Sequence, residues 1–157
     1  FDNVEGICAL ARTLNIPVAT GEQLFNRWEF RPLLEQNAVK IIQPDICHAG
    51  GLTELKKIAA AAETHYVSVA PHNSNGPIST VASLHLDTCI PNCFMQEIFV
   101  TFLSRYEQVL TKPIPIADGH ATAPDGIGWG TDIDLEALKA FPPNDYVTVE
   151  SEPYTAF

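Results

Sequence analysis

The stretch that decides the fold is "IIQPDICHAGGLTELKKIAAAAETHYVSVAPH", residues 41–72. An apolar run that began at Val39 stops at Pro44, and a second apolar run occupies 66–72. Between them, apolar side chains recur every three or four positions, as on one face of a helix: Leu52, Leu55, Ile58, Ala59 and Ala62. A strand, a helix and a second strand with short connections predict a βαβ unit in a parallel sheet.

The same alternation continues on both sides of this unit. Towards the N-terminus, helical periodicity over 4–14 precedes a short apolar run over 16–22, and a further helix is predicted around 31–36. Towards the C-terminus, Pro77 stands where the first turn of a helix tolerates proline, and 93–99 is the last apolar run of the series. The sequence therefore predicts an α/β fold with a parallel sheet.

Each predicted strand ends in an ionisable side chain. These residues are Glu22, Asp45, His72 and Glu97, about 25 positions apart, and a (β/α)8 barrel of about 250 residues allots about 31 to each unit. Active sites of such barrels lie at the carboxyl ends of the strands, so we expect the four to converge on one cleft. Four units form only half of a barrel and leave two unpaired sheet edges, so we expect the other half to exist elsewhere.

The pattern changes at Thr111. From there to Leu135 the chain is rich in proline, glycine and aspartate, and it shows short extended pieces with no regular helix. We expect residues 1–110 to form the second half of the barrel and residues 111–157 to form a C-terminal segment that packs across another part of the protein.

Composition excludes several classes of partner. The formal net charge of −10 argues against nucleic acid, because that affinity comes largely from clustered lysine and arginine. No stretch approaches the ~20 apolar residues that cross a bilayer, so we expect no membrane partner and a cytoplasmic location. The cysteines form no CxxC pair and are expected to be reduced thiols: Cys8, Cys47, Cys89 and Cys93.

Each strand-end residue has an ordinary interpretation and a functional one. Considered alone, Glu22 is interpreted either as a helix-capping residue or as a Mg²⁺ ligand. Asp45 alone is typical of a turn, and His72 alone is typical of a structural histidine. Glu97 lies in the apolar run "FMQEIF", where an unpaired buried carboxylate is costly, so we expect it to face a polar cavity. If these residues lie together, Asp45 can accept a hydrogen bond from one ring nitrogen of His72, which fixes the tautomer and leaves the other nitrogen as a base. A protonated Glu97 can donate a hydrogen bond to a substrate oxygen.

Three residues near this set are ambiguous. Asn73 and Asn75 follow His72 directly, where they either form the turn or reach substrate hydroxyls. His48 stands three residues after Asp45, and we interpret it as a helix-entry residue.

Four motifs carry a resemblance to a known family. "IPVATGEQLFNRWEF", "IIQPDICHAGGLTELKKIAAAAE", "VAPHNSNGPIST" and "FMQE" resemble the C-terminal half of the enolase superfamily in its mandelate racemase subgroup. Within that subgroup the chain is most similar to the galactonate dehydratase-like sugar-acid dehydratases. The "DGIGWG" of the tail departs from the usual "PGLG" of the family segment that returns to the capping domain.

The resemblance implies a chemistry for these residues. Glu22 would be the third Mg²⁺ ligand, Asp45 and His72 the His–Asp dyad with His72 as general base, and Glu97 a contact on the substrate carboxylate side. The enzyme would dehydrate an aldonate such as galactonate to a 2-keto-3-deoxy acid after removing the proton next to the carboxylate. The alternatives are a racemase or epimerase of the same superfamily and an inactive fragment or paralogue.

The resemblance also implies that parts lie outside the chain. Two further metal ligands and a histidine acid would come from strands before Phe1. We therefore expect the 157 residues to be the C-terminal portion of a longer, homo-oligomeric enzyme, inactive without its N-terminal part.

Overall fold

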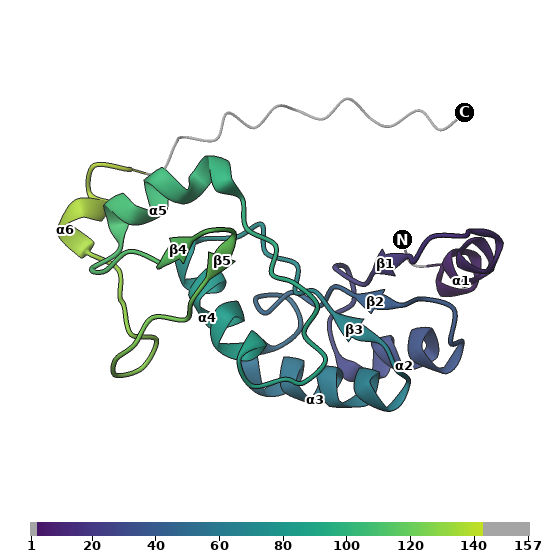
Figure 1. Cartoon of the computed structure of the whole chain (residues 1–157). Helices are drawn as coiled ribbons and strands as arrows, with labels where there is room; N and C mark the ends of the chain where they lie inside the picture. The colour runs from purple at the N-terminus through teal and green to yellow at the C-terminus, as the bar shows by residue number, and fades with distance from the viewer. Residues whose placement is uncertain (1–2, 143–157) are drawn as a thin grey trace, which may run out of the picture.

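The computed structural model describes residues 3–142, and the predicted alternation of helices and strands is present (Figure 1). In chain order the elements are α1 (Val4–Thr13), β1 (Ala19–Thr20), α2 (Arg27–Glu35), β2 (Ile41–Ile42), α3 (Gly51–Thr64), β3 (Ser68–Val69), α4 (Pro77–Asp87), the 3₁₀ turn η1 (Val100–Phe102), α5 (Leu103–Val109), β4 (Ile116–Ala117), β5 (His120–Ala121) and α6 (Leu135–Leu138). No helix within 3–142 is long and apolar enough to span a membrane.

The central sheet is parallel, with the strand order β1-β2-β3. Ala19 pairs with Ile41, and Ile41 pairs with Ser68, so the register is continuous across the three strands. These pairings confirm the parallel α/β prediction for the first three strands, although each is shorter than its apolar run. The predicted strand over 93–99 joins the sheet only through the bridge between Cys93 and Val69. A strand needs a ladder of partners, and within 3–142 nothing pairs with the far side of this stretch.

Side-chain caps fix where the helices begin. The Asn3 side chain accepts a hydrogen bond from the Gly6 amide and starts α1, close to the predicted bound. The Asn26 side chain accepts from the amides of Trp28 and Glu29, so α2 begins at Arg27 and not at the predicted position 31. The correction has a local cause, because this cap satisfies amides that would otherwise lack a partner.

The main core lies between the sheet and α2 and α3, which run along one face of it (Figure 1). The predicted apolar face of α3 is confirmed, with Leu55, Ile58, Ala59 and Ala62 buried. They pack in one cluster with core side chains from α2, β2, β3 and α4: Phe30, Leu33, Ile42, Val69 and Leu86. This cluster holds the strands in register and so fixes the ends that carry the polar residues.

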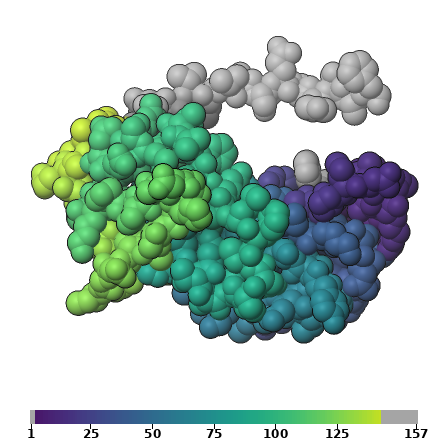
Figure 2. All heavy atoms as spheres, in the orientation of Figure 1, coloured from purple at the N-terminus to yellow at the C-terminus, as the bar shows by residue number. Residues whose placement is uncertain are grey.

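A second, smaller core joins α4 to the C-terminal segment. Val81 and Leu84 of α4 pack with Leu110 and Ile114, and Trp129 lies against both cores. Between 111 and 135 no regular helix is present, as predicted. In Figure 2 this green and yellow region gathers on one side of the molecule. Contact with a capping domain stays a prediction, and 143–157 lie outside the described residues.

The chain that leaves β1 requires a glycine at position 21. Its φ is +122°, and a Cβ there would lie 2.7 Å from Cε1 of the buried Phe30. We expect Gly21→Ala to lower the free energy of unfolding by about 2–3 kcal/mol, because strain and overlap add. Urea unfolding of the chain measures this loss. Gly76→Ala is the matched control, since its φ is ordinary and nothing lies within 4 Å; an equal loss in both variants would contradict the argument.

Candidate active site

The four predicted strand-end residues meet around one imidazole. His72 Nδ1 lies 2.7 Å from Asp45 Oδ2, and His72 Nε2 lies 3.6 Å from Glu22 Oε2 and 4.0 Å from Glu97 Oε2. The parallel strands bring these positions to the same edge, and a backbone bridge links Asp45 to His72 directly. The predicted convergence is confirmed, while the roles of the residues stay predictions.

Asp45 is completely buried and fully supplied with donors. Its Oδ2 accepts from His72 Nδ1 and from Asn75 Nδ2 at 2.8 Å. Its Oδ1 accepts from the backbone amides of Cys47 at 2.7 Å and His48 at 3.3 Å. These donors leave neither carboxylate oxygen of Asp45 without a hydrogen-bond partner. The contact of Asp45 with His72 Nδ1 favours the tautomer with the proton on Nδ1, so the lone pair of Nε2 faces the two half-buried carboxylates of Glu22 and Glu97.

Asn73 contacts Glu97 through both its backbone and its side chain. Its backbone N–H donates to Glu97 Oε2 at 2.8 Å, and its side-chain amide donates to Thr80 Oγ1 and to the Glu97 carbonyl. Only 2% of Asn73 is exposed. The predicted contact with substrate is untested, and this geometry favours a different role in which Asn73 sets the direction of the Glu97 carboxylate.

Asn75 supports the dyad in a similar way. Its amide donates to Asp45, and its backbone carbonyl accepts a hydrogen bond from the Tyr106 hydroxyl of α5. Asn75 is half-buried. The contact links α5 to the residue that holds the Asp45 carboxylate, so the geometry again favours positioning over a contact with substrate.

Two rings beside the dyad were not predicted as site residues. The His48 ring lies 6.3 Å from the His72 ring, and the Phe25 ring lies 6.1 Å from the His48 ring. The His48 side chain is 44% exposed, with Nδ1 3.9 Å from Asp45 Oδ2. His48 lies in the loop at the strand end, three residues before α3 begins at Gly51, so it does not itself start the helix. Its position in that loop was the sequence signal that could have placed His48 near the dyad.

Glu22 is the one predicted metal ligand in the chain. Its side chain is 43% exposed, and its oxygen type suits Mg²⁺. Within 3–142 no set of three His, Cys, Asp or Glu side chains is arranged to hold a metal ion. A role of Glu22 in holding Mg²⁺ therefore stays a prediction.

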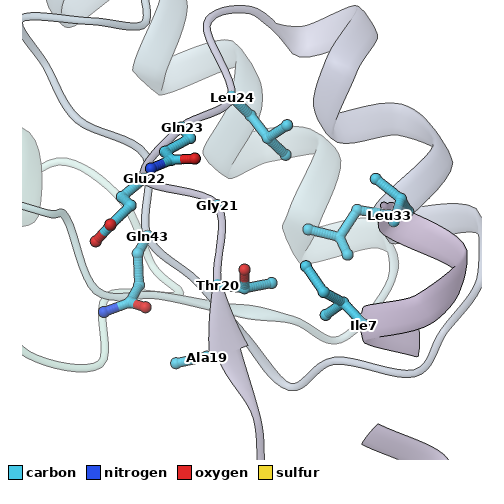
Figure 3. Close-up of a pocket in the computed structure, with 10 residues that line it drawn as sticks. Ile7, Ala19, Thr20, Gly21, Glu22, Gln23, Leu24, Leu33 and Gln43 are labelled. Carbon is cyan, nitrogen blue, oxygen red and sulfur yellow. The ribbon is translucent and has the colours of Figure 1, made fainter. Parts of the chain in front are cut away.

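A small cavity of about 110 Å³ lies beside β1 but does not contain the dyad. Figure 3 shows Ile7, Leu24 and Leu33 on one side of β1, while Glu22 and Gln43 project to the other. The apolar part belongs to the packing between α1, β1 and α2. Glu22 reaches past it towards His72, which places the candidate chemistry at the strand ends.

The parallel strands carry a His–Asp pair and two flanking carboxylates at their carboxyl ends, which is where (β/α)8-barrel enzymes place their active sites. The sequence profile of the enolase C-terminal domain-like family matches residues 1–138. The chain belongs to this family.

Curated relatives carry sugar-acid dehydratase names. The chain is 36% identical over 131 residues to D-xylonate dehydratase of Haloferax volcanii, a match that covers 83% of this chain and 32% of the relative. It is 39% identical over 136 residues to D-galactonate dehydratase of Xanthomonas euvesicatoria pv. vesicatoria, covering 83% of this chain and 36% of the relative. The chain thus spans about a third of the length of these relatives.

Solved structures agree with the fold. A member of the enolase superfamily from Salmonella Typhimurium superposes with a TM-score of 0.83 at 36% identity, covering 89% of this chain and 36% of that one. A mandelate racemase/muconate lactonizing enzyme from Sulfitobacter sp. superposes with a TM-score of 0.81 at 40% identity, covering 88% and 35%. The α/β fold therefore matches one half of an enolase-superfamily barrel.

Proposed function

We propose that this chain supplies the general base of a sugar-acid dehydratase. The observation that carries the proposal is the 2.7 Å contact between His72 Nδ1 and the buried Asp45, which leaves Nε2 facing the two carboxylates of the cleft. The dehydratase names of the curated relatives support the reaction class. Because the chain spans about a third of those relatives, the activity belongs to an assembled enzyme that also contains the complementary part of the subunit.

In the proposed reaction, His72 Nε2 takes the proton from C2 of an aldonate. Asp45 stabilises the imidazolium that forms, because its negative charge lies next to Nδ1. The electron pair left on C2 forms a double bond to C3 as the C3 hydroxyl departs. The departing hydroxyl takes a proton and leaves as water; by family resemblance the acid is a histidine outside this chain. The enol that remains becomes a 2-keto-3-deoxy acid.

Two carboxylates complete the proposed site. Glu97, whose Oε2 accepts a hydrogen bond from the Asn73 amide, would contact the substrate on its carboxylate side, as the family resemblance implies. Glu22 would hold Mg²⁺ with ligands from the complementary part. When bound, Mg²⁺ supplies positive charge that offsets the negative charge developing on the substrate carboxylate. We further propose an acid sugar as the partner and, as for the family, a homo-oligomeric enzyme.

A racemase or epimerase is the second candidate. The similarity to a solved mandelate racemase/muconate lactonizing enzyme favours it, since the same dyad can remove a proton and a second base can return it on the opposite face. That base would come from outside this chain. The two candidates differ in product, because only dehydration loses water.

The experiment joins this chain to the part of the Xanthomonas D-galactonate dehydratase that it does not match, in one polypeptide. The fused polypeptide is incubated with a panel of acid sugars that includes D-galactonate and D-xylonate, with and without Mg²⁺. Formation of a 2-keto acid only with Mg²⁺ is the expected result, and the chain alone is expected to be inactive. An isomeric acid without loss of water would favour epimerisation, and no turnover of any acid sugar would overturn both enzyme proposals.

A further inference from the structure

Two rings stand beside the dyad, and the proposed reaction gives neither of them a role. The centroid of the His48 ring lies 6.3 Å from that of His72, and the centroid of the Phe25 ring lies 6.1 Å from that of His48. The side chain of His72 is 15% exposed and that of His48 is 44% exposed, and Phe25 is exposed as well. A row of rings therefore leads from the proposed base towards solvent.

The loop that carries His48 is held tightly at the end of β2. The His48 amide donates to Asp45 Oδ1 at 3.3 Å, and the Ala49 amide donates to the Asp45 carbonyl at 2.8 Å. The amide of Gly51, where α3 begins, donates to the Ile46 carbonyl at 3.0 Å. Because hydrogen bonds fix the backbone on both sides of His48, its ring is presented beside the dyad from a fixed backbone position.

The loop that carries Phe25 is fixed too, and it is tied to α3. The Phe25 amide donates to Glu29 Oε2 at 2.7 Å. Arg27, at the start of α2, donates to Glu54 in the first turn of α3, from its backbone amide at 3.2 Å and from Nη1 at 2.8 Å. Because α2 and α3 follow the two loops, this ion pair holds the loops in one relative position.

The imidazole of His48 has unused hydrogen-bonding capacity. Its Nδ1 lies 3.9 Å from Asp45 Oδ2, too far for a hydrogen bond, and within 3–142 neither ring nitrogen has a closer polar partner. Asp45 Oδ2 already accepts from His72 and Asn75. A neutral imidazole offers one donor and one acceptor, and a sugar hydroxyl offers the same two functions. The ring can therefore bind a hydroxyl of a ligand that reaches His72.

Phe25 adds an apolar surface to this polar group. Its ring is tilted by 49° against the ring of His48, so the two are not stacked face to face. Small-molecule sites combine aromatic surfaces with a few placed polar groups that give specificity. An acid sugar matches this combination, because its hydroxyls alternate with C–H groups along the carbon chain.

We propose that His48 is a specificity-determining residue, which hydrogen-bonds a hydroxyl of the acid sugar beyond the reacting carbon, while Phe25 contacts the adjoining carbon chain. The inference rests on the proposed function, because it places C2 of the substrate at His72 Nε2. A hydroxyl further along the chain then lies within reach of a ring centred 6.3 Å from that of His72. A short 2-hydroxy acid gains nothing from His48, since its chain ends before this ring.

The test separates binding from chemistry. The fused polypeptide described above carries His72→Asn, so that no ligand is consumed, and Kd values are measured by calorimetry with Mg²⁺ present. The long ligands are D-galactonate and D-xylonate, and the short ligand is glycerate. His48→Phe keeps a ring but removes both nitrogens. It is expected to weaken binding of the long ligands about tenfold, as the loss of one hydrogen bond does, and binding of glycerate less than twofold.

Two further variants serve as controls. His48→Gln keeps a donor and an acceptor, so it should bind the long ligands within about threefold of the parent. His65→Phe, at the C-terminal end of α3, should leave all Kd values unchanged. Circular dichroism checks that each variant is folded. With His72 intact, the loss caused by His48→Phe should appear mainly as a higher KM, because the contact is made in the ground state as well as in the transition state.

The inference and the proposed function fail separately. Weaker binding of the long ligands alone by His48→Phe supports the inference, even if no acid sugar is dehydrated. Equal binding by His48→Phe and the parent overturns the inference, even if dehydration is observed. The inference is also overturned if the fused polypeptide binds neither long ligand, or if His48→Phe weakens glycerate binding by the same factor, because the change would then disturb the dyad in general.

Discussion

Replacing His72 with asparagine is expected to abolish 2-keto acid formation by the assembled enzyme, with a loss of about 10⁴-fold or more in kcat. The physical reason is the loss of the basic Nε2 that faces Glu22 and Glu97. The new amide can still donate to Asp45 Oδ2, so the buried carboxylate keeps a partner and the fold should persist. Turnover is measured by the 2-keto acid formed, and the fold by circular dichroism.

The control for this variant is another histidine to asparagine change. His65 lies at the C-terminal end of α3 and contacts Asn37, away from the dyad. His65→Asn should therefore leave kcat unchanged within about twofold, as surface changes away from a site have small effects. A His72→Asn enzyme with a near-normal rate would remove His72 from the mechanism.

The second large effect is expected from Asp45→Asn. The carboxylate accepts hydrogen bonds from His72, Asn75 and the amides of Cys47 and His48. An amide offers one acceptor oxygen and turns an NH₂ group towards donors, so about 3 kcal/mol of stability should be lost. The kcat should also fall by about 10⁴-fold, because the favoured tautomer of His72 changes.

Nitrogen NMR of the imidazole separates these two effects. In the wild-type chain, His72 should carry its proton on Nδ1 when neutral, and Asp45→Asn should shift the proton towards Nε2. A purely structural role of Asp45 would lower stability without this shift. Asp125→Asn serves as the matched control, because this carboxylate is exposed. A kcat within about tenfold of the wild type for Asp45→Asn would contradict the dyad, since a wrong tautomer costs far more.

The fold was predictable where periodicity is strong. The apolar face of α3 repeats over about three turns of helix, and its burial follows directly from that spacing. Strand lengths were not predictable, because an apolar run becomes a strand only where a neighbour supplies hydrogen bonds. The stretch after Cys93 shows this, since its sequence resembles a strand and its far side has no partner among the described residues.

The candidate site, like the fold, could be predicted only in part. Glu22, Asp45, His72 and Glu97 could be predicted to converge, because the carboxyl ends of parallel strands share one edge of a sheet. The directions of side chains in loops could not, since they depend on contacts with distant segments. Asn73 turns towards Thr80 and the Glu97 carbonyl, which belong to α4 and to the stretch after Cys93.

The central claim is that His72 removes the proton from C2. The most direct measurement uses galactonate labelled with deuterium at C2 and follows release of the label to water by NMR, with the assembled wild-type enzyme and with His72→Asn. The wild type should release the label and form the 2-keto acid, and His72→Asn should do neither. Release of the label by His72→Asn at the wild-type rate would contradict the claim, because another group would then be the base.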